Sequence, residues 1–523
     1  MLFSYTSAAQ FTVVSQKKIG GSGNDYIGFT YTHDSTGYYL IGNSDSNASF
    51  DKSENSRGGT DMWIVKTDLN FNIQWDKTIG GDQSESLFSS IITDTAIYCL
   101  LSTYSNLTGD MSVSNYGNSD FWLLKLDLNG NILLQKTFGG SGNEGYCRLL
   151  QKENHLLLVG NSDSPISGNK TIAPIGGDDL WLLEINPADF TVLSEKLIGS
   201  PFQDACMGVV QTNDNSWYIM SPTIQGVGGD KTDNGYGDQD FWIIKLDQNL
   251  NVLDNKCFGG SSAEPLGSLS TNGIDLYING YSYSEASGNK TAPNRGSFDA
   301  FTRPDCWVVK LDSNLNILWD ESYGGTNDES SGGITFLAND LIAIGSTSSS
   351  IMNSGNKTSP YFGGNDGWII IADTSGAIKN QLSFGGSAND NLSVRYQRGD
   401  TLFCSGTTKS PISGNQTTGT YSLNKADFWA VTIKTTNLSV PNNTENEVSL
   451  SVFPNPFNEK VEFNFGSPLS SEETINLYST DGKMVDKLVV HKGETSVSWK
   501  PTCQNGMYYY EINKNKGKVI FMK

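Results

Sequence analysis

A unit of about 60 residues recurs along most of this chain, and this period constrains the fold more than any other feature. Two independent markers count the units. A glycine pair, or its remnant, begins at Gly20, Gly80, Gly139, Gly199, Gly259, Gly324 and Gly385. The tripeptide Asp-x-Trp occurs with its tryptophan at Trp63, Trp122, Trp181, Trp242, Trp307, Trp368 and Trp429. Both markers give seven units at spacings of 59 to 65 residues, which predicts a repeat architecture.

Each unit reads as four strands separated by turn residues. In the third unit the strands are GYCRLLQ, HLLLVGNS, DLWLLEI and FTVLSEKLIG, with a long polar loop before the third. The third strand is apolar at consecutive positions, which is typical of a sheet that is buried on both faces. Seven units of four strands predict a seven-bladed β-propeller over residues 11–434.

The two ends of the repeat region complement each other. The segment FTVVSQKK, before the first glycine pair, has the pattern of a fourth strand, whereas no fourth strand follows the last Asp-x-Trp strand, DFWAVTIK. We expect the N-terminal strand to complete the last blade. Such closure removes two exposed sheet edges, which would otherwise pair with other chains.

The charge of the chain is concentrated in the repeats. The net charge is −21, and residues 450–523 contribute nine lysines and eight acidic residues, so residues 1–449 hold about −22. This balance argues against nucleic acid or an anionic membrane as a partner, because both require a basic surface. It is compatible with cations, neutral glycans or basic proteins. No run approaches the roughly 18 apolar residues of a membrane-spanning segment.

Cysteine and histidine offer little support for catalysis. The seven cysteines show no C-x-x-C spacing and six lie in or beside apolar strands, which predicts free, buried thiols. Only three histidines occur, at His33, His155 and His491, so a Ser-His-Asp, Cys-His or His-rich metal site is poorly supported. Hydrolysis by a carboxylate pair stays open, because Asp and Glu are numerous.

The segments outside the repeats have different characters. Residues 1–10, MLFSYTSAAQ, end in small residues like a cleavage region, so we interpret them as the remnant of a signal peptide whose start lies upstream. Residues 435–449 are polar and contain Pro441, which predicts a linker. From Leu450, alternating stretches such as KVEFNF and NGMYYYEI predict a small antiparallel, Ig-like β-sandwich over residues 450–523.

Ordered motifs in this last segment resemble a known family. They are VFPNPF from Val452, DGK from Asp481, NGMY from Asn505 and the terminal GKVIFMK, and the residues taken as its sorting signal are Pro454, Asn455, Pro456, Asp481, Gly482, Gly506 and Lys523. Together they resemble the type A sorting domain of the type IX secretion system of Gram-negative bacteria. The resemblance implies export through the periplasm by that machinery, followed by attachment to the cell surface or release. The repeats resemble, less specifically, glycine-rich propeller repeats of bacterial surface proteins, which implies a fold only.

Several polar residues recur in every unit. The Asp-x-Trp tryptophans are interpreted as packing anchors, and the preceding aspartates as acceptors for backbone donors at the start of the strand. An acid also follows each first glycine by five positions, at Asp25, Glu85, Glu144, Asp204, Glu264, Glu329 and Asp390. These acids either accept hydrogen bonds from N–H groups freed by the glycine turn, which we favour, or form a ring that binds a cation such as Ca²⁺. No other cofactor is expected.

Ligand sites are expected where the repeats differ. The fifth unit has the longest spacing, and its loop NRGSFDAFTRPD contributes Arg295, Phe298, Phe301 and Arg303 as candidate ligand-binding residues. A packing role for this loop is equally open. The sequence favours a secreted, non-enzymatic module that binds a glycan or protein through one face of the propeller. The alternative is a secreted carbohydrate-active enzyme, a hydrolase or lyase that uses carboxylates on that face.

Overall fold

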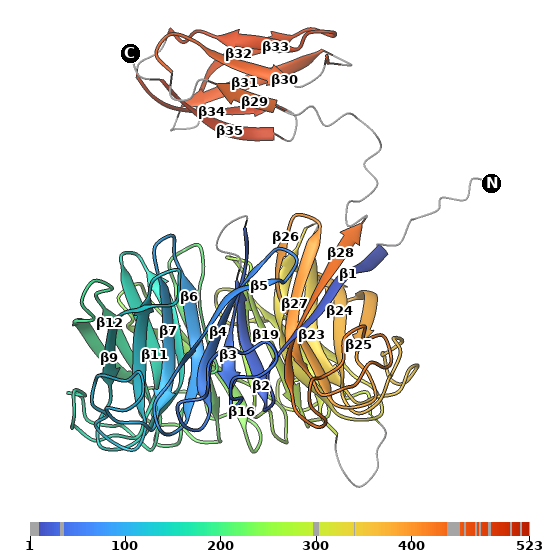
Figure 1. Cartoon of the computed structure of the whole chain (residues 1–523). Coiled ribbons are helices and arrows are strands. Elements are labelled where there is room, and N and C mark those ends of the chain that lie inside the picture. The colour runs from blue at the N-terminus through green and yellow to red at the C-terminus, as the bar shows by residue number, and fades with distance from the viewer. Residues whose placement is uncertain are drawn as a thin grey trace. The chain divides into compact units, whose positions relative to one another are not determined.

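The computed structural model describes residues 10–31, 36–296, 303–338, 340–436, 450–453, 457–465, 468–469, 472–479, 483–502, 505–512 and 515–521. Every element in these ranges is a strand, and the chain divides into two compact units, Met1–Leu438 and Ser439–Lys523. Residues 1–9 of the predicted signal-peptide remnant and 437–449 of the predicted linker lie outside the described residues. Figure 1 shows the first unit as sheets arranged around a common axis.

Seven four-stranded sheets make up the first unit, which confirms the predicted seven-bladed propeller. Blade 1 consists of β2 Asp25–Tyr31, β3 Gly37–Ser44, β4 Asp61–Asp68 and β5 Ile73–Ile79. Blade 2 consists of β6 Glu85–Ile92, β7 Ile97–Thr103, β8 Asp120–Leu126 and β9 Ile132–Phe138. Blade 3 consists of β10 Glu144–Lys152, β11 His155–Ser162, β12 Asp179–Ile185 and β13 Val192–Ile198. Blade 4 consists of β14 Gly208–Gln211, β15 Trp217–Thr223, β16 Asp240–Leu246 and β17 Val252–Phe258. Blade 5 consists of β18 Gly267–Thr271, β19 Leu276–Ser282, β20 Asp305–Leu311 and β21 Ile317–Tyr323. Blade 6 consists of β22 Glu329–Leu337, β23 Leu341–Ser348, β24 Asp366–Asp373 and β25 Ile378–Phe384.

The seventh blade joins the two ends of the repeat region. It contains β26 Asp390–Arg398, β27 Thr401–Thr408 and β28 Asp427–Thr436, and its outer strand is the N-terminal β1 Gln10–Ile19. Strand β1 pairs antiparallel with β28, with Ile19 opposite Phe428. The predicted closure of the ring by the N-terminal strand is therefore confirmed.

The blades have two distinct ends. First strands of neighbouring blades, such as β22 and β26, contact each other and are innermost, so the fourth strands form the outer side of the ring. In blade 1, Asp25 pairs with Ser44, and Ser44 pairs with Asp61. The start of the first strand, the end of the second and the start of the third therefore lie at the same end of the blade. That end, called here the long-loop face, also holds the glycine turns between blades and lies at the bottom of Figure 1. The opposite end holds the hairpins.

The core lies within and between the blades, as the apolar third strands predicted. All seven Asp-x-Trp tryptophans are fully buried, which confirms them as packing anchors. Burying a tryptophan side chain is worth a few kcal/mol at about 25 cal/mol per Å². The six cysteines within the described residues are free and buried, as predicted, and Cys503 lies outside them.

A recurrent turn closes the hairpin between the third and fourth strands. Asp68 Oδ1 accepts hydrogen bonds from the N–H groups of Asn70 and Asn72, each at 2.8 Å, and the same pattern recurs at Asp127, Asp247 and Asp312. These bonds lower the pKa of Asp68, because they stabilise its ionised form.

The second unit is a β-sandwich, as predicted. One sheet contains β29 Leu450–Phe453, β30 Val461–Phe465 and β33 Ser496–Trp499, and the other contains β32 Met484–Val490, β31 Glu473–Ser479, β34 Gly506–Ile512 and β35 Asn515–Phe521. Side chains of both sheets, such as Phe463, Leu477 and Trp499, form one buried core.

Candidate functional site

The recurrent acid of each unit lies at, or just before, the start of an innermost strand and is at most 2% exposed. In every blade its carboxylate accepts a hydrogen bond from the second N–H of the preceding glycine turn, at 2.7 to 3.2 Å. The donors are Gly21, Gly81, Gly140, Ser200, Gly260, Gly325 and Gly386. These bonds agree with the interpretation of the acids as backbone acceptors. Within the described residues no three His, Cys, Asp or Glu side chains form a metal-binding group, and the Ca²⁺ ring stays a prediction.

Each acid also meets the Asp-x-Trp aspartate of the preceding blade. The first glycine of the turn separates the two: Gly139 is so close to Asp120 and Glu144 that an added Cβ would lie 2.6 Å from Glu144 Oε2 and overlap with the Asp120 carboxylate. Burial, followed by repulsion from Glu144, raises the pKa of Asp120 to about 7. Burial is also the largest cause that raises the pKa to about 7 at Asp204, Asp305, Asp366 and Asp427.

Five blades contain a buried lysine near these carboxyl groups. The lysines are at most 2% exposed and are Lys52, Lys170, Lys231, Lys290 and Lys357. Lys170 Nζ donates hydrogen bonds to Ser162 Oγ at 3.0 Å and to the Ser164 carbonyl at 2.7 Å. Burial lowers the pKa of Lys170, and the charges of Glu144 and Asp179 oppose this effect. The carboxyl groups and lysines therefore form a buried polar layer that joins the blades.

The Asp-x-Trp aspartate fixes one residue of the long loop in every blade. Its Oδ2 accepts the backbone N–H of that residue, as the sequence predicted. The seven residues, called here the loop anchors, are Arg57, Tyr116, Ile175, Tyr236, Arg295, Phe362 and Tyr421. Their side chains contact the long-loop turn of the next blade: a Cβ added to Gly168 or Gly288 would lie 2.8 to 2.9 Å from the ring of Tyr116 or Tyr236.

Gly139→Ala is expected to destabilise the propeller by about 3 kcal/mol, because the new methyl group would have to push apart two buried carboxyl groups. Gly145→Ala is the matched control, since its added Cβ would meet no atom closer than 3.6 Å. Denaturant unfolding of both variants measures the difference. Equal stability of the two would contradict the close packing at Gly139.

The fifth-unit loop is described only in part. Phe298 and Phe301 lie outside the described residues. Arg295 is a loop anchor, and its guanidinium pairs with Glu321 and donates to the Ser322 carbonyl at 3.2 Å. Arg303 is exposed to a similar extent and pairs with Asp328 at 3.2 Å. Arg295 thereby reaches the outer strand of its own blade, beside a cavity, whereas Arg303 stays on the long-loop face.

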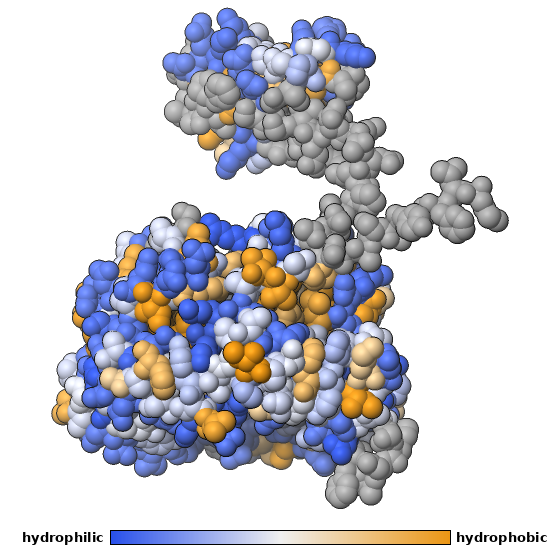
Figure 2. Space-filling model, turned by 45° about the vertical axis from the view of Figure 1, so that its right-hand side comes forward, coloured by the Kyte–Doolittle hydropathy of each residue, from blue (hydrophilic) through white to orange (hydrophobic). Residues whose placement is uncertain are grey.

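Sequence reasoning missed one aromatic group on the long-loop face. Phe50 is 63% exposed and has a φ of 51°, at a turn position where the other six blades have glycine with φ between 54° and 60°. Its ring stacks on Tyr421 with centroids 4.5 Å apart and an interplanar angle of 9°. The signal was present in the sequence, because SFDK at Ser49 replaces the SGNK of other units. Elsewhere, apolar side chains lie in small separate groups among polar ones on the side of the propeller that Figure 2 shows.

The sorting-signal residues fall mostly outside the described part of the second unit. Pro454, Asn455, Pro456, Asp481, Gly482 and Lys523 are among the residues that the structure does not describe. Gly506 is the first residue of β34 and pairs with Phe521 of β35. This residue is thus an ordinary member of the second sheet.

Comparison with known proteins gives one family match. Residues 451–522 match the model of a secretion system C-terminal sorting domain. No curated protein shows significant similarity to the chain. Similar solved structures include the WD40 domain of Neurospora crassa Pan2, with 9% identity over 82% of this chain and 97% of that chain at a TM-score of 0.42. The Dos1 propeller has 9% identity over 81% and 95% at 0.42, and a Dyadobacter fermentans protein of unknown function has 8% over 81% and 99% at 0.41.

Seven four-stranded sheets and a C-terminal sorting domain define the class: a β-propeller that is a cargo of the type IX secretion system. The sorting domain directs export through the periplasm to the cell surface or the medium. Among the described residues, none belongs to a helix with the length and apolarity that crossing a bilayer requires.

Proposed function

We propose that this secreted protein is a non-enzymatic binding module whose long-loop face holds a neutral carbohydrate, with Phe50 as the stacking surface. Hydrolysis by a pair of carboxyl groups would draw first on the recurrent acids, but these are buried and hydrogen-bonded to the backbone. A glycosidase requires its carboxyl pair to reach the substrate. The buried layer therefore supports a role in blade packing, and binding falls to the side chains that break the repeat.

Phe50 is the observation on which the proposal rests. The left-handed backbone conformation costs a residue with a side chain about 1–2 kcal/mol, a cost that the glycines of the other six blades avoid. Strain of this kind is retained where the side chain has a use. At 63% exposure, that use is not burial in the core.

The stack leaves one flat face open. Lys18 Nζ lies 3.3 Å from the centroid of the Tyr421 ring, and Phe50 stacks on the same ring at 4.5 Å. Both cannot occupy one face, so Tyr421 lies between them and the outer face of Phe50 faces solvent. The negative face of an aromatic ring attracts the C–H groups of a sugar ring. Because Lys18 already supplies a cation to the stack, the open face suits a neutral ligand better than a second cation.

Phe50→Gly is expected to abolish carbohydrate binding without loss of stability. Glycine relieves the backbone strain of about 1–2 kcal/mol and forfeits a stack worth about 0.5–1.5 kcal/mol, so the unfolding temperature should stay nearly the same. The measurement is a glycan array with the secreted protein, followed by calorimetry on the neutral polysaccharides that bind. Leu107→Gly is the matched control, because Leu107 also has positive φ and is 60% exposed on a long loop.

Three results would count against the proposal. Binding that survives Phe50→Gly would remove Phe50 from the site. A large fall in unfolding temperature would assign Phe50 to ring closure. Degradation of a polysaccharide by the purified protein would favour the alternative, a carbohydrate-active enzyme.

A further inference from the structure

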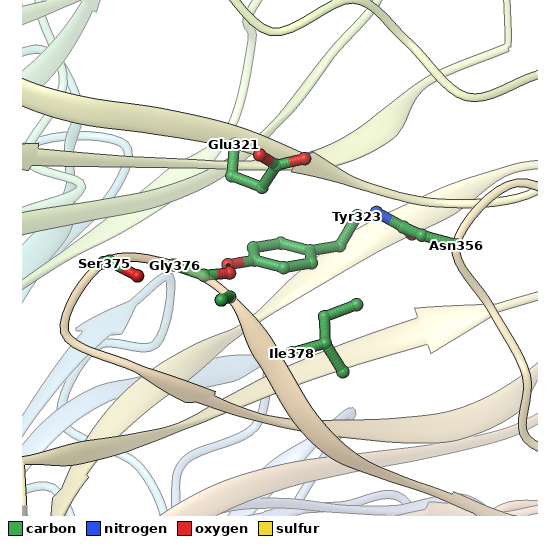
Figure 3. A pocket seen from close by; sticks show the side chains of 7 residues that line it. Glu321, Tyr323, Asn356, Ser375, Gly376 and Ile378 are labelled. Carbon is green, nitrogen blue, oxygen red and sulfur yellow. Dashed lines mark hydrogen bonds between the residues drawn. The ribbon is translucent and has the colours of Figure 1, made fainter.

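A cavity of about 280 Å³ lies on the outer side of the ring, at the junction of blades 5 and 6 (Figure 3). Its lining comes from β21 of blade 5, from a long-loop residue of blade 6, and from the hairpin turn of blade 6 with the first residue of β25. The residues are Glu321, Tyr323, Asn356, Ser375, Gly376, Ala377 and Ile378. The Tyr323 ring lies along the cavity, and its hydroxyl donates to the Gly376 carbonyl at 2.7 Å. Polar groups of one blade thus face a turn of the next.

The other blade junctions show what normally occupies this place. The residue three positions before the glycine pair is a lysine in five units, at Lys17, Lys77, Lys136, Lys196 and Lys256. The two exceptions are Glu321 and Leu382. Leu382 packs against the buried cluster that includes Trp429 of the seventh blade, and this blade has no hairpin turn between its third and fourth strands because β1 supplies its outer strand. Glu321 is therefore the one position that faces a hairpin turn without being a lysine.

Three of these lysines bind the turn of the following blade directly. Lys136 Nζ donates to the Phe190 carbonyl at 2.8 Å, and Lys196 Nζ donates to Asn251 Oδ1 at 2.6 Å. Lys256 Nζ donates to the Asn314 and Leu315 carbonyls, both at 3.3 Å, and to Asn316 Oδ1 at 3.2 Å. The hairpin turn is thus a built acceptor for an ammonium group.

The cavity is lined by the same turn positions. Ser375, Gly376 and Ala377 are the third, fourth and fifth residues of their turn, as Asn314, Leu315 and Asn316 are of theirs. In place of a lysine, the preceding blade presents the Glu321 carboxylate. Arg295 pairs with Glu321 Oε1, and in the described part of the chain Oε2 has no hydrogen-bond partner. Of the three turn acceptors that Lys256 uses, the Ser375 carbonyl is the counterpart left open, because the Gly376 carbonyl accepts from Tyr323 and Ala377 has no side-chain oxygen. The internal ammonium is absent, and a carboxylate paired with Arg295 lies in its place.

We propose that this cavity binds a primary alkylammonium group of an extracellular ligand, in the place that the lysine ammonium takes at the other junctions. Glu321 and the Ser375 carbonyl are the acceptors for its N–H groups, and Arg295 positions Glu321. A primary ammonium has three donors, which suits a carboxylate combined with turn carbonyls. Tyr323 and Ile378 contact the methylene stem. The excess of about −22 charges on residues 1–449 attracts cations to the ring.

A free diamine and the lysine side chain of a partner protein share this chemistry. Calorimetry on the secreted protein at low ionic strength, with 1,4-diaminobutane in one arm and a lysine-containing pentapeptide in the other, distinguishes the two sources. One equivalent should bind, and salt should weaken the binding. Tetramethylammonium, which has the same charge but no N–H donor, is expected not to compete.

Glu321→Lys is the decisive variant, because it restores the residue found at five other junctions. It is expected to lower the affinity at least about tenfold, which corresponds to 1.4 kcal/mol. The unfolding temperature should fall only slightly, because the lost ion pair with Arg295 is partly exposed and worth at most about 1 kcal/mol. Asp254→Lys makes the same charge change at an exposed position of another outer strand, β17, and should bind normally. Phe50→Gly should also leave amine binding unchanged, which separates this site from the carbohydrate site.

Unchanged binding by Glu321→Lys would overturn the proposal. So would equal loss in Asp254→Lys, which would indicate attraction by net charge alone, or equal binding of tetramethylammonium. Selective loss in Glu321→Lys with retained stability would support it.

Discussion

A chain that lacks residues 450–523 is expected to accumulate in the periplasm, with almost none at the cell surface or in the medium. The sorting domain within these residues is the part that the type IX machinery handles, and it forms a compact unit separate from the propeller. The propeller closes its own ring through β1 and β28, so its folding does not require the deleted residues. Cell fractionation in a host with a type IX system, followed by immunoblotting of each fraction, measures the distribution.

Point variants of the sorting domain provide the controls. Trp499 is buried in the core of the sandwich, and its replacement by alanine costs about 3–5 kcal/mol. This is comparable to the whole stability of a small domain, so Trp499→Ala should also retain the protein in the periplasm. Tyr509→Ala removes an exposed side chain of the same unit and should be secreted normally. Normal secretion of the deletion variant would show that export does not depend on this domain.

The propeller is expected to be more stable at pH 5.5 than at pH 8. Burial raises the pKa of Asp120, Asp204, Asp305, Asp366 and Asp427 to about 7 in the folded chain. The unfolded chain releases these protons near pH 4, so between the two values the folded state binds more protons. The stabilisation that these five protonated carboxyl groups contribute is therefore fully present below about pH 4 and is lost as the pH rises through 7. Each carboxyl group contributes up to about 1.4 kcal/mol per pH unit, and several act together.

Thermal unfolding at constant ionic strength across this range tests the prediction. Asp120→Asn should flatten the pH dependence, because the amide retains an acceptor for the backbone N–H of Tyr116 but does not titrate there. Asp254→Asn, at an exposed site, should leave the slope unchanged. The turn aspartates act in the opposite sense: the lowered pKa of Asp68 and Asp312 means that stability falls when the pH drops below their unfolded pKa. An unfolding temperature that rises from pH 5.5 to pH 8 would refute the effect of the buried carboxyl groups.

The period alone predicted the number of blades, their four strands and the closing strand, since each depends on a pattern repeated within about 60 residues. It also indicated the role of Glu144 and its equivalents, because an acid that follows every glycine turn meets the N–H groups of that turn. Lys170 and its equivalents were not predicted to be buried. The ammonium group of Lys170 binds Ser162 and Ser164 beside the carboxyl group of Glu144, a placement that spacing along the sequence does not reveal.

Residues that break the pattern were harder to interpret. The sequence left both a ligand contact and a packing role open for Arg295. In the structure its guanidinium binds Glu321, which sequence reasoning had not singled out, and the ligand contact stays a prediction. Phe50 and Tyr421 are 371 positions apart, yet they stack across the junction that closes the ring. In both cases the substitution is visible in the aligned repeats, but its partner is not: Glu321 lies 26 positions after Arg295 in the same unit, and Tyr421 lies in another unit than Phe50.

The sequence by itself therefore determined the blade: its strands, its buried tryptophan, its glycine turn and the acid that satisfies that turn. These features are local, because strand pairing and turn chemistry within one blade involve residues close in the chain. Only the tertiary structure decided what happens between blades. A cavity or an open aromatic face forms where two surfaces meet, and its shape depends on both side chains at once. Glu321 has its significance only beside the turn at Ser375, and the packing of blade 6 against blade 5 brings the two to one cavity.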